Sequence, residues 1–235
     1  MSREIFKAAS FFFALVLFTL FLPNNAYSVP SFKRQTGMSC NACHTAFPEL
    51  TPFGRAFKLG GYTQSNSDKP YEYPPPVAAM VQASYTEAKG LNTGIAPFNN
   101  GDNDKINIPQ QASLFYGGKI YGNTGAFVQL TYSGISNSLN LDNTDLRYAD
   151  DVTVGGTPLI YGVTVNNNPT VQDAWNTTPA WGFPYATSAV ANTPAASAVI
   201  DGGLAQQVGG IGVYGYWNNL IYGELSVYGT NRRGI

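Results

Sequence analysis

Apolar and polar residues alternate along most of the chain after residue 76, and a period of two predicts β-strands. In "GAFVQLTYS", residues 125–133, every second residue from Ala126 to Tyr132 is apolar or aromatic, and polar residues occupy the opposite face from Gln129 onward. The same alternation predicts strands over 77–87, 111–121, 144–154, 159–165, 205–216 and 220–229, of which the glycine-rich 205–216 is the weakest. The pattern therefore predicts seven strands.

The connections between these strands are alternately long and short. The long ones cover 89–109, 135–143 and 166–204, and the short ones cover 122–124, 155–158 and 218–220. Outer-membrane β-barrels combine long external loops with tight periplasmic turns and carry girdles of aromatic residues at both interfaces. Candidate girdle residues are Tyr85, Tyr121, Tyr132, Tyr161 and Tyr228. A soluble β-sandwich, in which tyrosines simply pack within strands, is the alternative.

We therefore expect a mainly β chain that forms a transmembrane antiparallel β-barrel with about seven strands in this sequence. Closed bacterial barrels have an even number of strands, so an odd count predicts further strands beyond Ile235. A shorter, rearranged sheet is the alternative, but it leaves an unpaired edge that lipid does not tolerate.

The N-terminus has the three parts of a secretory signal peptide. Arg3 and Lys7 precede the apolar run Phe11–Leu22, and small residues follow, which predicts cleavage before Val29. That run has 12 residues, whereas a membrane-spanning helix needs about 20. Without residues 1–28 the chain has 11 basic and 13 acidic residues. Because it lacks a cationic excess, nucleic acid is not an expected partner.

Both cysteines and the only histidine of the chain lie within five consecutive positions. The spacing of Cys40, Cys43 and His44 is Cys-x-x-Cys-His, which is typical of c-type haem attachment: two thiols hold the macrocycle and the imidazole binds its iron. A zinc site lacks its second ligand pair here. A thioredoxin-like redox pair or a short structural disulfide leaves the histidine unexplained. Haem is attached to cytochromes c after export, so the signal supports the motif.

Residues 51–60, "TPFGRAFKLG", predict a short helix near this motif. Thr51 is the expected N-cap, Pro52 the first helical residue and Gly60 the C-terminal stop. Phe53 and Phe57 share one face, where they either wall the macrocycle or pack beneath the barrel. The nearby cations are candidates for pairing with haem propionates, with solvated surface charge as the alternative. These cations are Lys33, Arg34, Arg55 and Lys58.

Residues 29–62, "VPSFKRQTGMSCNACHTAFPELTPFGRAFKLGGY", resemble the N-terminal haem segment of the fused monohaem cytochrome c-porins of the bacterial outer membrane. The stretches "LRYADD" and "LIYGVTVNNNPTVQDAWNTTPAWGFPYA" resemble the barrel region of that family, which includes iron-oxidising outer-membrane cytochromes. The resemblance implies a signal peptide over 1–28, a haem c segment over 29–76 and the first part of a barrel over 77–235. Family members extend beyond the point where this sequence ends.

The resemblance implies electron transfer across the outer membrane by one covalent haem c. Its expected donor is extracellular ferrous iron, its acceptor a periplasmic soluble carrier, and outer-membrane lipid its surroundings. The haem segment is expected on the periplasmic side or in the barrel lumen. A transport porin with a haem-bearing plug or sensor segment is the alternative. A haem peroxidase is less consistent with a chain that has a single histidine.

Two methionines are candidates for the second axial iron ligand, because Met1 leaves with the signal peptide. Met80 is favoured over Met38, since it shares the polar face of strand 77–87 with Gln82 and Ser84 and therefore points into the lumen. A gap-filling role for Met80 is the alternative. Acidic loop residues are candidate collectors of ferrous ions or ordinary solvated charges. These residues are Asp102, Asp104, Asp142 and Asp173.

Overall fold

The structure, a computed structural model, describes residues 30–66, 75–87, 104–177 and 204–230. The expected signal peptide and cleavage site lie outside this part of the chain, as does Asp102. The helices are α2 (Pro30–Thr36), α3 (Cys40–Cys43), α4 (Pro52–Leu59) and the 3-10 helix η1 (Pro169–Gln172). The strands are β1 (Val77–Glu87), β2 (Asp104–Tyr121), β3 (Thr124–Ser133), β4 (Ser138–Val154), β5 (Thr157–Asn166), β6 (Val208–Trp217) and β7 (Ile221–Thr230).

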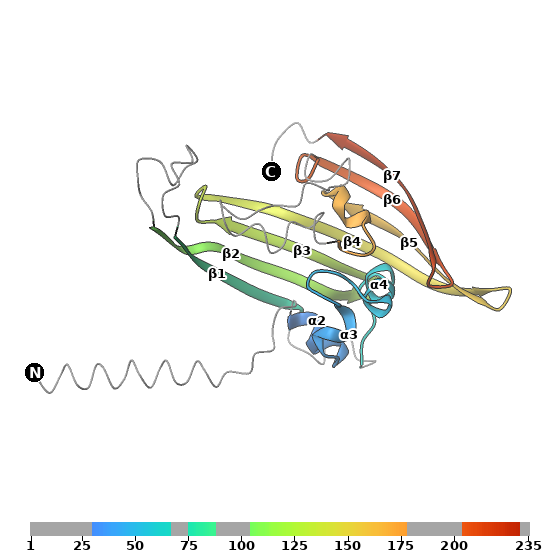
Figure 1. The fold of residues 1–235 in the computed structure, drawn as a ribbon. Helices are drawn as coiled ribbons and strands as arrows, with labels where there is room; N and C mark the ends of the chain where they lie inside the picture. The colour runs from blue at the N-terminus through green and yellow to red at the C-terminus, as the bar shows by residue number, and fades with distance from the viewer. Residues whose placement is uncertain (1–29, 67–74, 88–103, 178–203, 231–235) are drawn as a thin grey trace, which may run out of the picture.

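The seven strands form one antiparallel sheet in the order of the sequence, as Figure 1 shows. Each strand pairs with the next, from β1–β2 to β6–β7. Among the described residues, β1 and β7 do not pair with each other, so this sheet is open. The mainly β fold and the predicted set of seven strands are confirmed, whereas closure into a barrel is not shown. None of the helices in the described ranges is long and apolar enough to cross a bilayer.

One predicted long connection is wrong. Strand β4 begins at Ser138 instead of residue 144, and only 134–137 connect it to β3. The pairing of the two strands continues to Ser133 and Ser138 at their ends. Asn137 has φ of 51°, a left-handed conformation that asparagine tolerates better than most residues. The tight turn therefore lets β4 begin earlier than predicted and interrupts the expected rhythm of long and short connections.

Strand β2 is also longer than predicted, because it begins at Asp104 and contains Pro109. The register between β1 and β2 shifts between Gln82 and Ser84, opposite the stretch that holds the proline. Proline has no N–H to donate to a ladder and is tolerated at such irregularities. The break in register thus allows one strand to continue on both sides of Pro109.

The two faces of the sheet have opposite chemistry. Apolar side chains on one face, here called the outer face, are open to the surroundings: the exposed fractions of Leu114, Val213 and Leu225 are 62%, 55% and 75%. On the opposite, inner face, Asp145 and Arg147 are fully buried. Among the candidate girdle tyrosines, Tyr85, Tyr121 and Tyr161 are exposed and Tyr132 is half-buried. Tyr228 does not fit a girdle, because its hydroxyl donates to Asn166 Oδ1 on the inner face at 3.0 Å.

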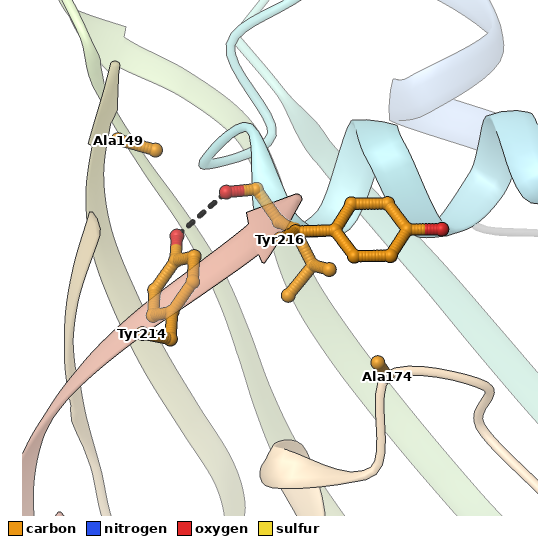
Figure 2. Packing of buried hydrophobic residues seen from close by; sticks show 5 residues of the cluster. Ala149, Ala174, Tyr214 and Tyr216 are labelled. Atoms are coloured by element: carbon orange, nitrogen blue, oxygen red, sulfur yellow. Dashed lines mark hydrogen bonds between the residues drawn. The ribbon is translucent and has the colours of Figure 1, made fainter. Parts of the chain in front are cut away.

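The N-terminal helices and η1 cover part of the inner face. Leu59 at the end of α4 packs with Ala149, Ala174, Tyr214 and Tyr216 in the buried cluster of Figure 2. The Tyr214 hydroxyl donates to the Leu59 carbonyl at 2.6 Å. The contact between the helix segment, residues 30–66, and the sheet is also close at Gly125, where an added Cβ would lie 2.1 Å from the Gly61 carbonyl oxygen. Glycine is required there because backbone meets backbone.

Candidate functional site

The cysteine motif forms its own short helix, α3. The His44 N–H donates to the Cys40 carbonyl at 3.0 Å and ends this helix. The two thiols are half-buried and are not joined in a disulfide. Residues three apart on a helix are neighbours on one side of it, so the two thiols share a face. Burial raises the pKa of the Cys43 thiol, and the neighbouring Cys40 adds to that rise.

The His44 ring is oriented by its own loop. Its Nδ1 lies 3.2 Å from the Pro48 carbonyl oxygen, and a carbonyl in this position fixes Nδ1 as the protonated nitrogen. Nε2 then keeps its lone pair for a metal ion, and such a hydrogen bond to the other nitrogen is common in metal-binding histidines. Burial lowers the pKa of His44, although hydrogen bonds to the loop backbone oppose that shift.

Thr51 joins this motif to helix α4. Its Oγ1 accepts a hydrogen bond from the Gly54 N–H at 3.1 Å and donates to the Ala42 carbonyl at 2.6 Å. Its own N–H donates to the Cys43 carbonyl at 2.9 Å. The predicted helix is therefore confirmed, with Thr51 as N-cap, Pro52 at its start and Gly60 as C-cap. An added Cβ at Gly54 would lie 2.2 Å from the Cys43 carbonyl oxygen, so glycine permits this close contact.

The motif lies on the wall of a cavity of about 730 Å³ between the helices and the inner face of the sheet. Cys40, Cys43 and His44 all line this cavity. Its aromatic wall is formed by Phe32, Phe47, Phe57, Phe115 and Phe127. Its polar wall includes Gln82, Gln111, Gln129, Thr131, Asp142, Asn143 and Gln206. Cofactor pockets are typically about 300–1,000 Å³ and mostly apolar with a few polar groups. Volume, aromatic wall and donor set thus fit a macrocycle held by two thiols and an imidazole.

Both candidate methionines line the same cavity. Met80 lies on the inner face, as predicted, and the Gln82 side-chain amide donates to its Sδ at 3.7 Å. Met38 is more open, with an exposed fraction of 37%. The structure thus brings Met80, which lies in strand β1, to the same cavity as Cys40, Cys43 and His44 of the helix segment. Ligation of iron by Met80 stays a prediction.

The four candidate cations have different surroundings. Lys33 and Lys58 line the cavity, whereas Arg34 and Arg55 are not among its lining residues. Arg34 donates to the Val77 carbonyl, and Arg55 donates to the Leu50 carbonyl at 3.0 Å. Lys58 is 3% exposed, so it is not a solvated surface charge. Its burial could not be predicted from the local sequence.

The remaining candidates are only partly brought to the site. Phe57 lines the cavity but Phe53 does not, so only one of the pair can form its wall. Asp142 lines the cavity from strand β4, and therefore the prediction that it is a loop residue is wrong. Asp173 caps a turn, accepting from the Trp175 N–H at 3.0 Å. Asp104 begins β2, and its side chain lies outside the described part of the structure.

A buried charge network beneath α4 was missed by the sequence analysis. Arg147 Nε donates to Asp145 Oδ2 at 2.7 Å, and both side chains have no exposed surface. Asp145 also accepts from the Tyr62 hydroxyl at 2.6 Å and from Thr164 Oγ1 at 2.7 Å. The Arg147 Nη2 group donates to the Val171 carbonyl at 3.1 Å. This network joins the helix segment, η1 and two strands. Its one sequence signal is a pair of opposite charges with strand spacing in "TDLRYADD".

Comparison with models of protein families, with curated proteins and with solved structures finds no match to this chain. Fold and site together define an antiparallel β protein whose Cys-x-x-Cys-His segment is docked on the polar face of its sheet. Within the described ranges, no three histidine, cysteine or acidic side chains gather around a point that could hold a bare metal ion.

Proposed function

We propose that the protein is an outer-membrane c-type cytochrome that transfers electrons across the outer membrane. Cys40 and Cys43 hold one haem c covalently, and His44 is an axial ligand of its iron. One observation carries the proposal: all three residues line a cavity of about 730 Å³ with an aromatic wall, next to the inner face of the sheet. When bound, the haem supplies one-electron redox chemistry at its iron.

The residues of this chain have supporting roles in that process. The Pro48 carbonyl accepts from His44 Nδ1, which leaves Nε2 as the nitrogen whose lone pair can bind the iron. Thr51 holds the motif against α4 by contacts to Ala42 and Cys43. Phe57 and Phe127 exclude water from the cavity and lower its polarity, which influences the reduction potential of a haem.

Membrane insertion is supported by the chemistry of the sheet. Its outer face is apolar and exposed, while its inner face is polar and partly covered. This arrangement is that of a transmembrane barrel with a polar interior. An open edge in lipid leaves N–H and C=O groups without partners, so we propose that further strands close the sheet between β1 and β7. The helix segment would then lie in the lumen.

The proposed donor is extracellular ferrous iron, and the proposed acceptor is a soluble periplasmic carrier. Both assignments rest on the resemblance of residues 29–62 to the cytochrome-porins. Rapid mixing of the haem-loaded full-length protein with ferrous iron at acidic and neutral pH tests the donor. Reduction of the haem at either pH is expected, and absence of reduction at both would exclude ferrous iron.

Covalent haem is tested by staining for haem peroxidase activity after denaturing electrophoresis. The wild-type protein should stain, and the double variant Cys40→Ala/Cys43→Ala should not. Asn41→Ala is the matched control, because Asn41 is an exposed residue between the two cysteines. It should stain like the wild type. Loss of all haem from the wild type on acid-acetone extraction would refute covalent attachment.

A transport porin with a haem-bearing plug is the second candidate. It is favoured by the position of α4, which is packed on the polar inner face through Leu59 and Tyr214. In that case the haem-bearing segment acts as a plug or sensor of the pore, and the haem does not pass electrons between the two sides of the membrane. Electron transfer across a sealed bilayer therefore distinguishes the two functions.

A further inference from the structure

Lys58 is a buried cation on the wall of the candidate haem cavity. It lies in the last turn of α4. Its Nζ donates to the Asp173 carbonyl at 2.7 Å and to Asn176 Oδ1 at 2.8 Å. These contacts come from the segment that follows η1, 115 and 118 residues away in sequence. The ammonium group is therefore held in place by one segment that is distant in the sequence.

Lys58 and Lys33 are the two cations among the cavity-lining residues that the structure describes. They differ in burial, because Lys33 is exposed and Lys58 is 3% exposed. A charge in water is screened, whereas a buried charge acts strongly on a nearby group. Of the two, Lys58 is thus the cation with the larger effect on an anion in the cavity.

Several charged groups face Lys58 from the elements around it. Asp145 and Arg147 belong to β4, Asp173 follows η1, and Glu224 belongs to β7. Burial, and next the like charge of Arg147, lower the pKa of Lys58 to about 7, while the three carboxylates oppose this shift. A further anion next to Nζ would favour the charged ammonium and raise its pKa again.

We propose that Lys58 binds a propionate carboxylate of the haem held by Cys40 and Cys43. This inference rests on the proposed function and names a residue that positions the haem. An ionised carboxylate in a largely apolar cavity is costly unless a cation and hydrogen bonds compensate its loss of water. Lys58 supplies that cation in the lining of the same cavity as the cysteine motif.

The consequence is a propionate that stays ionised over a wide range of pH. In Lys58→Gln the propionate loses its cation, and the pKa of its carboxyl group rises toward neutral pH. Rising pH then adds a negative charge near the iron of this variant. A negative charge favours the ferric state, so the reduction potential of the variant should fall as pH rises. The wild type should show a flatter profile over the same range.

The experiment is a spectroscopic redox titration of the full-length, haem-loaded protein at several pH values from 5 to 8. Lys58→Gln should show a steeper fall in potential with pH than the wild type, and Lys58→Arg should restore the flatter profile because it keeps the charge. Lys33→Gln is the matched control and should resemble the wild type. A wild-type profile in Lys58→Gln would overturn the assignment.

A measurement on the wild type alone covers the case in which Lys58→Gln does not fold. The propionate bending bands of the resonance Raman spectrum should not titrate together between pH 5 and 8, because one carboxylate is held ionised. Titration of both propionates in this range would refute the role of Lys58. A wild-type protein without any haem stain would instead refute the proposed function itself, so the two failures are distinguishable.

Discussion

The inner and outer faces of the sheet differ in the opposite sense from those of a water-soluble protein. Leu225 on the outer face is 75% exposed, while Arg147 on the inner face is fully buried. Asp145 and Thr164, also on the inner face, have no exposed surface. Several polar groups of the inner face bond to one another, as in the bonds from Arg147 and Thr164 to Asp145.

This difference indicates which medium each face meets. Exposure of apolar surface to water costs about 25 cal/mol per Å², so a face with many exposed aliphatic side chains is unfavourable in water and favourable in lipid. Burial of a charged pair is also costly unless its hydrogen bonds are complete. The strands thus place their polar residues on the face that the helices partly cover and their apolar residues on the face that we propose meets the bilayer. The following variants test each side of this comparison.

The largest effect is expected on the inner face. Arg147→Met leaves Asp145 buried without its cation, and loss of one partner of such a pair costs about 3–5 kcal/mol. The free energy of unfolding, measured by urea titration of the protein in detergent or lipid, should fall by this amount. Asp151→Asn, at an exposed position of the same strand, should change it by less than about 0.5 kcal/mol. Equal stability of both variants would mean that the Asp145–Arg147 pair does not hold the inner face.

The second effect is expected on the outer face. Val213 is 55% exposed in the middle of β6, and arginine near the midplane of a bilayer costs about 2–4 kcal/mol. Val213→Arg should therefore lower the stability of the protein in lipid by this amount. Val154→Arg is the control, because Val154 is a 55% exposed outer-face residue next to the turn at Gly155, and it should cost about 0–1 kcal/mol. If Val213→Arg is neutral or makes the protein soluble without detergent, the outer face meets water.

A smaller effect is expected where the helix segment meets itself above the inner face. An added Cβ at Gly54 would lie 2.2 Å from the Cys43 carbonyl oxygen, so α4 must shift away from the motif. Overpacking of this kind typically costs about 1–3 kcal/mol. Gly54→Ala should lower the fraction of protein that stains for haem. Gly209→Ala, where the added Cβ meets no atom within 4 Å, should stain like the wild type.

The smallest effect on stability is expected for Met80, which changes the spectrum instead. If its Sδ binds the haem iron, Met80→Ala should remove the sulfur-to-iron charge-transfer band and lower the reduction potential. Met38→Ala, at the other cavity-lining methionine, should leave both unchanged. An unaltered spectrum and potential in Met80→Ala would exclude this residue as the ligand.

The local pattern of the sequence was sufficient to predict the strands and the helix after the motif. Alternation located all seven strands because side chains of a strand point to opposite faces. Thr51, Pro52 and Gly60 located α4 because capping depends on neighbouring residues. The early starts of β2 and β4 were missed. Pro109 and the Asn- and Asp-containing stretch 138–143 have low strand propensity, and their long pairings with neighbouring strands override it.

The site depended on contacts that local sequence does not contain. The motif itself was evident from the spacing of Cys40, Cys43 and His44, and the inward direction of Met80 followed from its parity. The burial of Lys58 was not predictable, because its partner Asp173 is 115 residues away. The same is true of Tyr62, which donates to Asp145 across 83 residues. Such contacts arise only when the helix segment docks on the sheet.

The most direct test of the proposed function is electron transfer across a sealed membrane by the full-length protein. The haem-loaded protein is inserted into liposomes that contain a membrane-impermeant oxidant, and a membrane-impermeant reductant is added outside. We expect the haem absorption to show reduction and the enclosed oxidant to be consumed, whereas Cys40→Ala/Cys43→Ala liposomes should show neither change. Reduction of the haem without any consumption of the enclosed oxidant would contradict electron transfer across the membrane and favour the plug or sensor.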